Sequence, residues 1–181
     1  MRAITGMAKL LSAATVLALA ISTGAGAETV LKMAPHAALP NLDPVVSQTT
    51  ITLNHSYMVY DTLFATDGDG KTQPQMIGSW KTSDDGLVWD FTLRPDLKFQ
   101  DGSAVTSRDA VASLKRWAPR SASGRAMTNR MASLEAVDDR SFRLTLKQPF
   151  GPVTQSFAEL LAPFVMREAD LAEVEPGKAI A

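Results

Sequence analysis

Residues 83–111 read SDDGLVWDFTLRPDLKFQDGSAVTSRDAV, and this stretch indicates the fold class more clearly than any other part of the chain. Its first half places strongly apolar side chains at every second position, which is the period of a β-strand with one buried face. The apolar members of this alternation are Leu87, Trp89, Phe91 and Leu93. Asp-Gly pairs at 85–86 and 101–102 predict turns on the two sides of the strand.

The second half of the same stretch predicts a helix. Thr106 and Asp109 have the spacing of a capping box, with Asp in place of the usual Glu or Gln. Pro119 ends the helix that they open. The side chains that we expect it to bury are Val111, Leu114 and Trp117.

Patterns outside this stretch predict further strands and helices. A strand is expected at 29–33, and a hairpin at 134–137 and 142–146 across Asp138-Asp139. One helix is expected from Ser47 to about residue 61, with an apolar stripe of Leu53, Tyr57, Tyr60 and Phe64. Another is expected to start at Pro152, with the stripe Val153, Phe157, Leu160 and Leu161. The predicted fold class is therefore α/β in the broad sense, a mixed α+β architecture.

The composition narrows the function classes. The chain has 181 residues, a formal net charge of −1, two histidines and no cysteine. A charge so near zero argues against a nucleic-acid binder. The absence of cysteine excludes disulfides, Cys-ligated zinc, iron–sulfur clusters and thiol catalysis. His36 and His55 lie far apart in the sequence, so we expect no metal site and no cofactor.

Residues 1–27 have the features of a cleaved signal peptide. Arg2 and Lys9 give a positive start, residues 10–21 form an uncharged apolar run, and Ala25-Gly26-Ala27 supplies the small-x-small cleavage pattern. The apolar run is too short for a membrane span, which needs about 20 residues. We therefore expect an exported, periplasmic protein that is not embedded in a membrane and, lacking cysteine, carries no lipid anchor.

The charged residues are distributed unevenly. Residues 110–134 contain five cations and no acid, whereas residues 159–175 contain five acids and one cation. The five cations are Lys115, Arg116, Arg120, Arg125 and Arg130. Such a run can be a solvated helix face, or some of its arginines can bind an anionic group such as a carboxylate.

Several motifs stand in a definite order along the chain. They are Leu42-Asp43-Pro44, Tyr60-Asp61-Thr62-Leu63-Phe64, Ile77-Gly78-Ser79-Trp80, Trp89-Asp90-Phe91-Thr92-Leu93-Arg94, Lys98-Phe99-Gln100-Asp101-Gly102-Ser103, Val105-Thr106-Ser107-Arg108-Asp109-Ala110-Val111 and Val137-Asp138-Asp139-Arg140-Ser141-Phe142. This order closely resembles the large peptide-type solute-binding proteins of ABC importers (family 5), which include oligopeptide, dipeptide and nickel-chelate binders. Most of the motif residues are expected to be scaffold, with Trp80, Trp89 and Phe91 as core anchors.

The resemblance implies a two-lobed periplasmic-binding-protein-like fold that holds a solute between its lobes. By this analogy residues 28–47 are the first strand and loop of lobe I, residues 48–175 are an inserted α+β subdomain, and residues 176–181 are a truncated end. The rest of lobe I and lobe II would then be absent, and residues 28–181 alone are expected to bind no solute saturably.

The resemblance also implies where the solute is contacted. Two segments are expected to touch it: the loop after the first strand, residues 35–39, and the segment after the capped helix, residues 123–128. The candidate ligand-binding residues are His36, Ala37, Ala38, Arg125 and Met127. Arg125 can pair with a ligand carboxylate. Family members often place an aromatic residue or an arginine in the second segment, and this sequence has Arg125 but no aromatic residue there.

The function implied is that of the periplasmic solute-binding component of an ABC transporter. As a monomer, it would bind a small solute, with a peptide as the default class, and deliver it to permease subunits without catalysis. Nickel chelates, opines and sugars stay open as solutes. Two other function classes also stay open: a small exported hydrolase, for which no nucleophile motif stands out, and a stand-alone periplasmic interaction domain.

Overall fold

The computed structural model of this protein describes residue 32, residues 34–174 and residues 178–179. The chain divides into two compact units, Met1–Ala34 and Pro35–Ala181, and the description below concerns the second. The predicted signal peptide lies outside the described residues, and so does the predicted strand at 29–33 except for Lys32.

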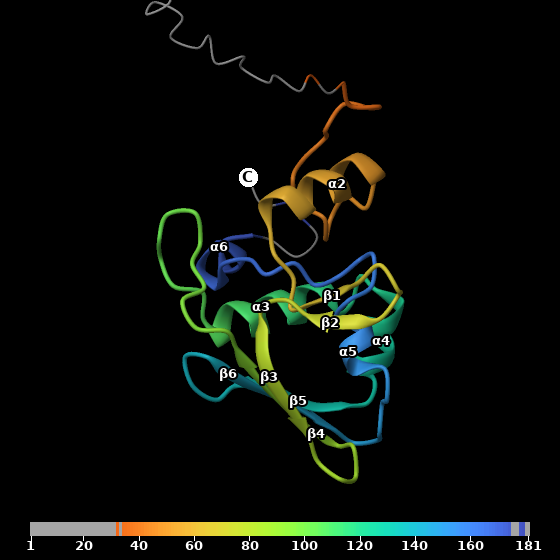
Figure 1. Ribbon diagram of the computed structural model, residues 1–181, viewed down its shortest axis with the longest axis vertical. Coiled ribbons are helices and arrows are strands. Elements are labelled where there is room, and N and C mark those ends of the chain that lie inside the picture. Colours follow the sequence, from red (N-terminus) through yellow and green to blue (C-terminus); the bar gives the residue numbers. More distant parts are fainter. Residues whose placement is uncertain (1–31, 33, 175–177, 180–181) are drawn as a thin grey trace, which may run out of the picture. The chain divides into compact units, whose positions relative to one another are not determined.

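A four-stranded antiparallel sheet forms the centre of the second unit. Its strands are β3 (Ile77–Thr82), β4 (Val88–Leu93), β5 (Met131–Ala136) and β6 (Ser141–Leu146). They lie in the order β3-β4-β6-β5, so β4 and β6 are the inner strands (Figure 1). The strand predicted over 87–93 is confirmed as β4, and the predicted hairpin is confirmed as β5–β6, with β5 beginning earlier than expected.

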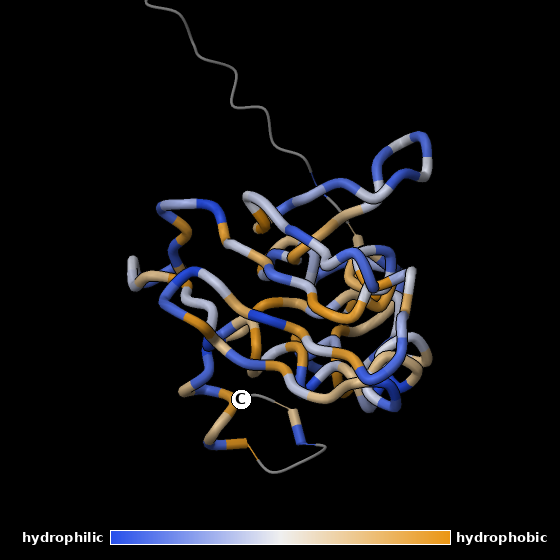
Figure 2. The backbone as a smooth tube through the Cα atoms, turned by 90° about the horizontal axis from the view of Figure 1, so that it is seen from below, coloured by the Kyte–Doolittle hydropathy of each residue, from blue (hydrophilic) through white to orange (hydrophobic). Residues whose placement is uncertain are grey.

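The core lies on one face of this sheet. Register sets Phe91 of β4 opposite Phe142 of β6, and the two rings stack with centroids 5.0 Å apart. The helix α3 (Ser107–Trp117) packs against β5 and β6. It adds Val111, Leu114 and Trp117 to the core, as predicted. Figure 2 shows the hydrophobic segments gathered in the interior and the hydrophilic ones in the outer loops.

The start of α3 is fixed by the predicted capping box. The amide N–H and the hydroxyl of Thr106 donate to the Asp109 carboxylate at 2.7 and 2.8 Å. The same carboxylate accepts the amide N–H of Glu168 at 2.8 Å. Asp109 therefore also ties α6 (Glu168–Ala172) to the first turn of α3.

Four turns depend on the same contact, in which an Asp carboxylate accepts the N–H of the residue two positions later. The pairs are Asp67 with Asp69, Asp85 with Leu87, Asp101 with Ser103, and Asp138 with Arg140. The turns predicted at 85–86, 101–102 and 138–139 are therefore confirmed. Hydrogen bonds from neighbouring side chains and amides hold the pKa of each of these four carboxyls below its ordinary value of 3.8.

The helix predicted from Ser47 to about residue 61 is shorter in the structure. It is α2 (Thr50–Val59), and Thr49 is its N-cap. The expected stripe is wrong at Phe64, which begins the strand β1 (Phe64–Thr66) and is buried in the core. The reason is pairing across the turn at 67–70, because β1 forms a two-stranded sheet with β2 (Thr72–Pro74).

The helix predicted from Pro152 is also shorter, and it is α5 (Val153–Ser156). Its first apolar positions are buried, but Leu160 is 71% exposed, so the expected stripe is wrong there. Long-range partners replace the helical hydrogen bonds after α5. The Thr66 hydroxyl donates to the Ala158 carbonyl at 2.9 Å, and the Trp117 indole N–H donates to the Leu161 carbonyl.

The prediction that Trp80 is a core anchor is wrong, whereas Trp89 and Phe91 are core residues. Trp80 is 41% exposed because β3 is an edge strand with no further strand beyond it. One edge of its ring packs on Phe64, with centroids 5.2 Å apart, and the remainder faces solvent.

Phe91 is fully buried and contacts rings from several elements. Replacing Phe91 with Ala is expected to lower the free energy of unfolding by about 3–5 kcal/mol, because it removes a large apolar side chain and leaves a cavity. Urea unfolding followed by tryptophan fluorescence measures the change. Trp80→Ala is the matched control at the opposite position on β3, and an equal loss there would contradict the assigned core.

The turn carboxylates predict how stability depends on pH. A carboxyl whose pKa is lower in the folded state stabilises the protein above its unfolded pKa, and that stabilisation is lost as pH falls through the folded pKa. Stability should therefore decline as pH falls from about 5 to below 3.8, the ordinary value of these carboxyls.

Asp138→Ala tests this prediction in one turn, where Oδ1 accepts the amides of Arg140 and Ser141, each at 2.8 Å. The variant should be less stable than the natural protein at pH 7, and the difference should shrink at pH 3. Urea midpoints at both pH values measure it. Asp139→Ala in the same turn is the control, and a difference that grows toward pH 3 would show that the carboxylate does not stabilise the turn.

Candidate functional site

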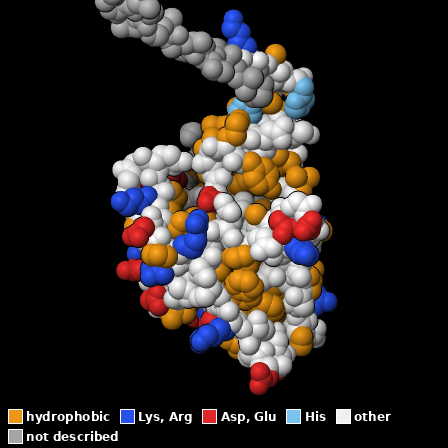
Figure 3. All heavy atoms as spheres, viewed as in Figure 1, with side chains coloured by type: hydrophobic (Ala, Val, Ile, Leu, Met, Phe, Trp, Pro, Cys, Tyr) orange, Lys and Arg blue, Asp and Glu red, His pale blue; other side chains and the backbone are white. Residues whose placement is uncertain are grey.

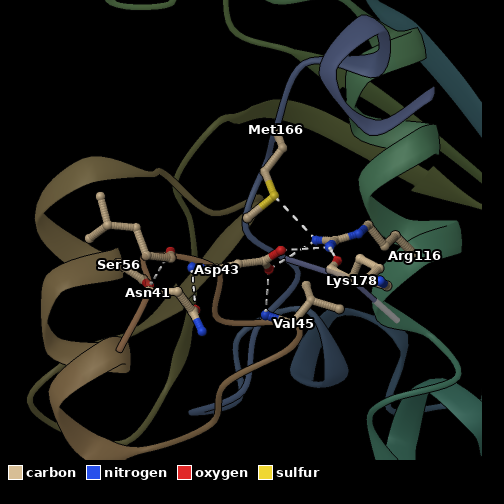
Figure 4. Close-up of polar contacts among 8 residues, drawn as sticks. Asn41, Asp43, Val45, Ser56, Arg116, Met166 and Lys178 are labelled. Atoms are coloured by element: carbon tan, nitrogen blue, oxygen red, sulfur yellow. Dashed lines mark hydrogen bonds and ion pairs between the residues drawn. The ribbon is translucent and has the colours of Figure 1, made fainter. Parts of the chain in front are cut away.

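Asp43 lies at the centre of a buried polar cluster where the segment before α2 meets α3 (Figure 4). Its side chain is 0% exposed. Oδ1 accepts the amide N–H of Val45 at 3.0 Å, and the Asp43 amide itself donates to Oδ1 of Asn41 at 3.0 Å. Pro44 between them has a fixed φ. These contacts fold residues 41–45 into a tight turn that points its carboxylate inward.

Arg116, in the last turn of α3, supplies the cation that a buried carboxylate requires. Its Nη1 and Nη2 donate to Oδ1 and Oδ2 of Asp43 at 3.0 and 2.6 Å, a bidentate pairing. Nη2 also donates to the carbonyl oxygen of Lys178 at 3.0 Å, and Nη1 lies 3.7 Å from Sδ of Met166. One guanidinium therefore joins the turn before α2, the helix α3 and the last described residues.

Tyr60, which follows α2, lies within the electrostatic range of this pair. Burial raises the pKa of its phenol, the Asp43 carboxylate raises it further, and the Arg116 cation lowers it. Its ring meets that of Phe164 edge-on, with centroids 6.4 Å apart. The phenol therefore stays neutral and adds apolar cover beside the ion pair.

No pattern in the sequence pairs Asp43 with Arg116. Asp43 lies in the Leu42-Asp43-Pro44 motif, and Arg116 lies in the acid-free run 110–134. One feature of the sequence nevertheless indicates a distant partner for Arg116. A cation on the buried side of a helix that has no acids nearby must find a carboxylate elsewhere in the chain. Arg116 of this run binds a carboxylate of the chain itself, which neither interpretation of the run predicted. That another arginine of the run binds an anionic group stays a prediction.

The first predicted binding segment, residues 35–39, is an exposed stretch that bends at 36–37. It carries the candidates His36, Ala37 and Ala38. Hydroxyl groups of α2 hold the chain just after it. The Thr52 hydroxyl donates to the carbonyl of Asn41 at 3.2 Å, and the Ser56 hydroxyl donates to the carbonyl of Leu42 at 3.4 Å. The exposed segment 35–39 therefore leads into residues 41–42, which hydrogen bonds from α2 hold in place.

The second predicted segment forms the helix α4 (Ala122–Thr128), capped by the Ser121 hydroxyl, which accepts the N–H of Gly124 at 3.2 Å. Arg125 is exposed, and its Nη1 donates to the carbonyl of Pro119 at 3.0 Å. Met127 is 1% exposed and belongs to the core. The two candidates on α4 therefore differ in access to solvent.

Arg125 and Met127 nevertheless line the same cavity, of about 400 Å³, between α4, the end of α3 and β5. Leu114 and Leu134 give it apolar walls, and Lys115 is a second cation in its lining. An apolar hollow with exposed guanidinium and ammonium groups can accept an apolar group that ends in a carboxylate.

A larger cavity of about 690 Å³ lies on the other side of α3, next to the ion pair. Val45 and Arg116 line it together with Leu171 of α6, and Lys115, Arg120 and Glu168 are its other charged residues. Lys115 lines both cavities, so the end of α3 separates them.

The structure does not bring the two predicted binding segments into contact. Among the hydrogen bonds and ion pairs of residues 34–174, none joins 35–39 to α4. In Figure 1 the segment before α2 lies at the top of the second unit, whereas α4 lies lower, beside α5. The described residues also contain no group of three or more metal-ligating side chains.

Arg116→Met leaves Asp43 buried without its guanidinium. The change is expected to lower the free energy of unfolding by about 3–5 kcal/mol, because an uncompensated buried charge is costly. The double variant Asp43→Asn, Arg116→Met should recover part of this loss, since no ion then remains. Urea unfolding of four proteins measures the cycle: the natural protein, Asp43→Asn, Arg116→Met and the double variant. A double variant less stable than the sum of the single losses would contradict direct pairing.

Comparison with known proteins identifies relatives of this chain. The model of the bacterial extracellular solute-binding proteins, family 5 (middle part), matches residues 71–180. A protein of Sinorhizobium fredii, described as a probable peptide ABC transporter periplasmic-binding protein, is 38% identical over 151 residues. The alignment covers 82% of this chain and 28% of the relative, so the chain spans little more than a quarter of that relative's length.

Two solved structures share the fold. OppA of Listeria monocytogenes bound to a peptide has a TM-score of 0.64 and 25% identity over 76% of this chain and 30% of that protein. MoaA of A. tumefaciens R10 in complex with mannopinic acid has a TM-score of 0.63 and 28% identity over 73% of this chain and 28% of that protein. Among the residues that the structure describes, no helix has the length and apolar character needed to span a bilayer.

Proposed function

Because this chain belongs to the family 5 bacterial extracellular solute-binding proteins, we propose that it serves as part of the periplasmic solute-binding component of an ABC transporter, with a peptide as the solute. The observation that carries this proposal is the 38% identity, over most of this chain, to a peptide ABC transporter periplasmic-binding protein. A structural observation also supports the proposal: the cavity at Arg125 is suited to a group that ends in a carboxylate.

We also propose that the protein is exported to the periplasm and acts there with permease subunits. Residues 1–27 act as a signal peptide that sends the chain to the periplasm, where the protein works as a monomer and is not an enzyme. A solute is bound between two lobes and handed to permease subunits of the transporter. Residues 28–47 belong to the first lobe, and residues 48–175 form a subdomain inserted in it.

We place two segments against the solute. Arg125 donates to a carboxylate of the solute, and Met127 forms part of the apolar floor below it. The exposed loop with His36, Ala37 and Ala38 approaches the solute from the first lobe. A carboxylate is common to peptides and to the mannopinic acid bound by the MoaA relative, so the pairing with Arg125 suits both classes.

The test begins with protein produced from its complete gene. Mass spectrometry of the solute released on denaturation identifies the class, and isothermal titration then measures affinity. Arg125→Ala is expected to weaken binding by roughly 10-fold to 100-fold, because it removes a charge-assisted hydrogen bond. Arg143→Ala, at an exposed arginine on the opposite face of the sheet, is the control.

Two results would contradict this proposal. If the released solute has no carboxylate, the role assigned to Arg125 is wrong. If no peptide or other small solute binds the intact protein, the solute-binding function itself is wrong.

A further inference from the structure

The turn at Asn41–Val45 connects the exposed loop 35–39 to the rest of the molecule. The side chain of Asn41 holds the Asp43 amide, and both oxygens of the Asp43 carboxylate are held by Arg116. The loop therefore enters the folded unit at a turn that Arg116 of α3 holds together with the hydroxyls of Thr52 and Ser56 of α2. Among the hydrogen bonds between described residues, only those from Arg116 tie this turn to α3.

The same end of α3, from which Arg116 projects, is joined closely to α4. Gly124 of α4 packs so tightly on the end of α3 that a Cβ there would lie 2.6 Å from the carbonyl oxygen of Ala118. Arg125 reaches back to the carbonyl of Pro119 at 3.0 Å. Close packing of this kind leaves α4 little freedom to move relative to α3.

We propose that the Asp43–Arg116 ion pair is a positioning device that fixes the loop 35–39 relative to α4. This inference rests on the function proposed above, in which both segments contact the solute. The pair would then hold the two binding segments at one separation before the solute arrives, which lowers the ordering cost of binding.

The geometry of the Asp43–Arg116 contact supports a role in positioning the loop 35–39 rather than in stabilising the fold. Burying an ion pair brings little net stability compared with apolar residues of the same size, whereas a bidentate fork accepts its carboxylate in one orientation. The Arg116 side chain is 17% exposed and that of Asp43 is 0% exposed. Arg143 and Asp90 form a fork of similar geometry on the sheet surface, 50% and 45% exposed, and supply a matched comparison.

The absence of natural cysteines makes the separation measurable. Spin labels are attached at Leu39→Cys, at the end of the loop, and at Ala122→Cys, at the exposed start of α4. Double electron–electron resonance gives the distribution of distances between them. Arg116→Met and Asp43→Asn should at least double the width of that distribution, whereas Arg143→Met and Asp90→Asn should leave it unchanged.

The outcomes separate positioning from stabilisation. Arg116→Lys keeps the charge without the fork, so an intermediate width is expected, and this variant serves if Arg116→Met does not fold. A narrow, unshifted distribution in folded Arg116→Met or Arg116→Lys, with only a lower urea midpoint, would overturn the proposal, as would equal broadening in the surface-pair variants. The measurement needs no solute, so its result is independent of whether the proposed function is right.

Discussion

The pairing of Asp43 with Arg116 is the contact on which the placement of the first described segment depends. A carboxylate with no exposed surface cannot stay ionised without a cation and hydrogen-bond donors around it. Both are present, from the end of α3 and from the amide of Val45. The turn at 41–45 can therefore occupy one place only, against the last turn of a helix that is itself fixed by the sheet.

Apolar packing and polar contacts do different work in this molecule. The stacked rings of Phe91 and Phe142 and the apolar side of α3 drive burial, which is not directional. The polar contacts are directional, and they sit where segments distant in sequence meet. Asp109 ties α6 to the start of α3, and Arg116 ties the segment before α2 to its end. Among the described residues, α3 is thus the common support for the core and for the surface on which we place the solute. Figure 3 shows exposed hydrophobic side chains on one face of the molecule.

Local patterns were enough to predict three of the four strands of the central sheet, β4, β5 and β6, and the turns at 85–86, 101–102 and 138–139, whereas β3 was not predicted. The alternation in residues 87–93 and 142–146 identified the two inner strands, and Asp-Gly pairs identified turns because Asp accepts the amide two residues on. The failures have one cause, which is that a pattern along the chain says nothing about distant partners. Phe64 has helical spacing but pairs across a hairpin with Pro74. Trp80 looks like a core residue but lies on an edge strand, whose position depends on the order of strands far apart in sequence.

The same limit applies to the candidate site. Arg116 and Arg125 come from one acid-free run, and the charge pattern alone does not distinguish them as carboxylate ligands. The structure distinguishes them. Both terminal nitrogens of Arg116 donate to an internal carboxylate, whereas Arg125 donates Nη1 to a backbone carbonyl and is exposed to solvent. A run of cations therefore predicts a binding site only after its internal partners are known. Here the internal partner removes Arg116 from the candidates for direct contact and leaves it the role of placing the loop that precedes Asp43.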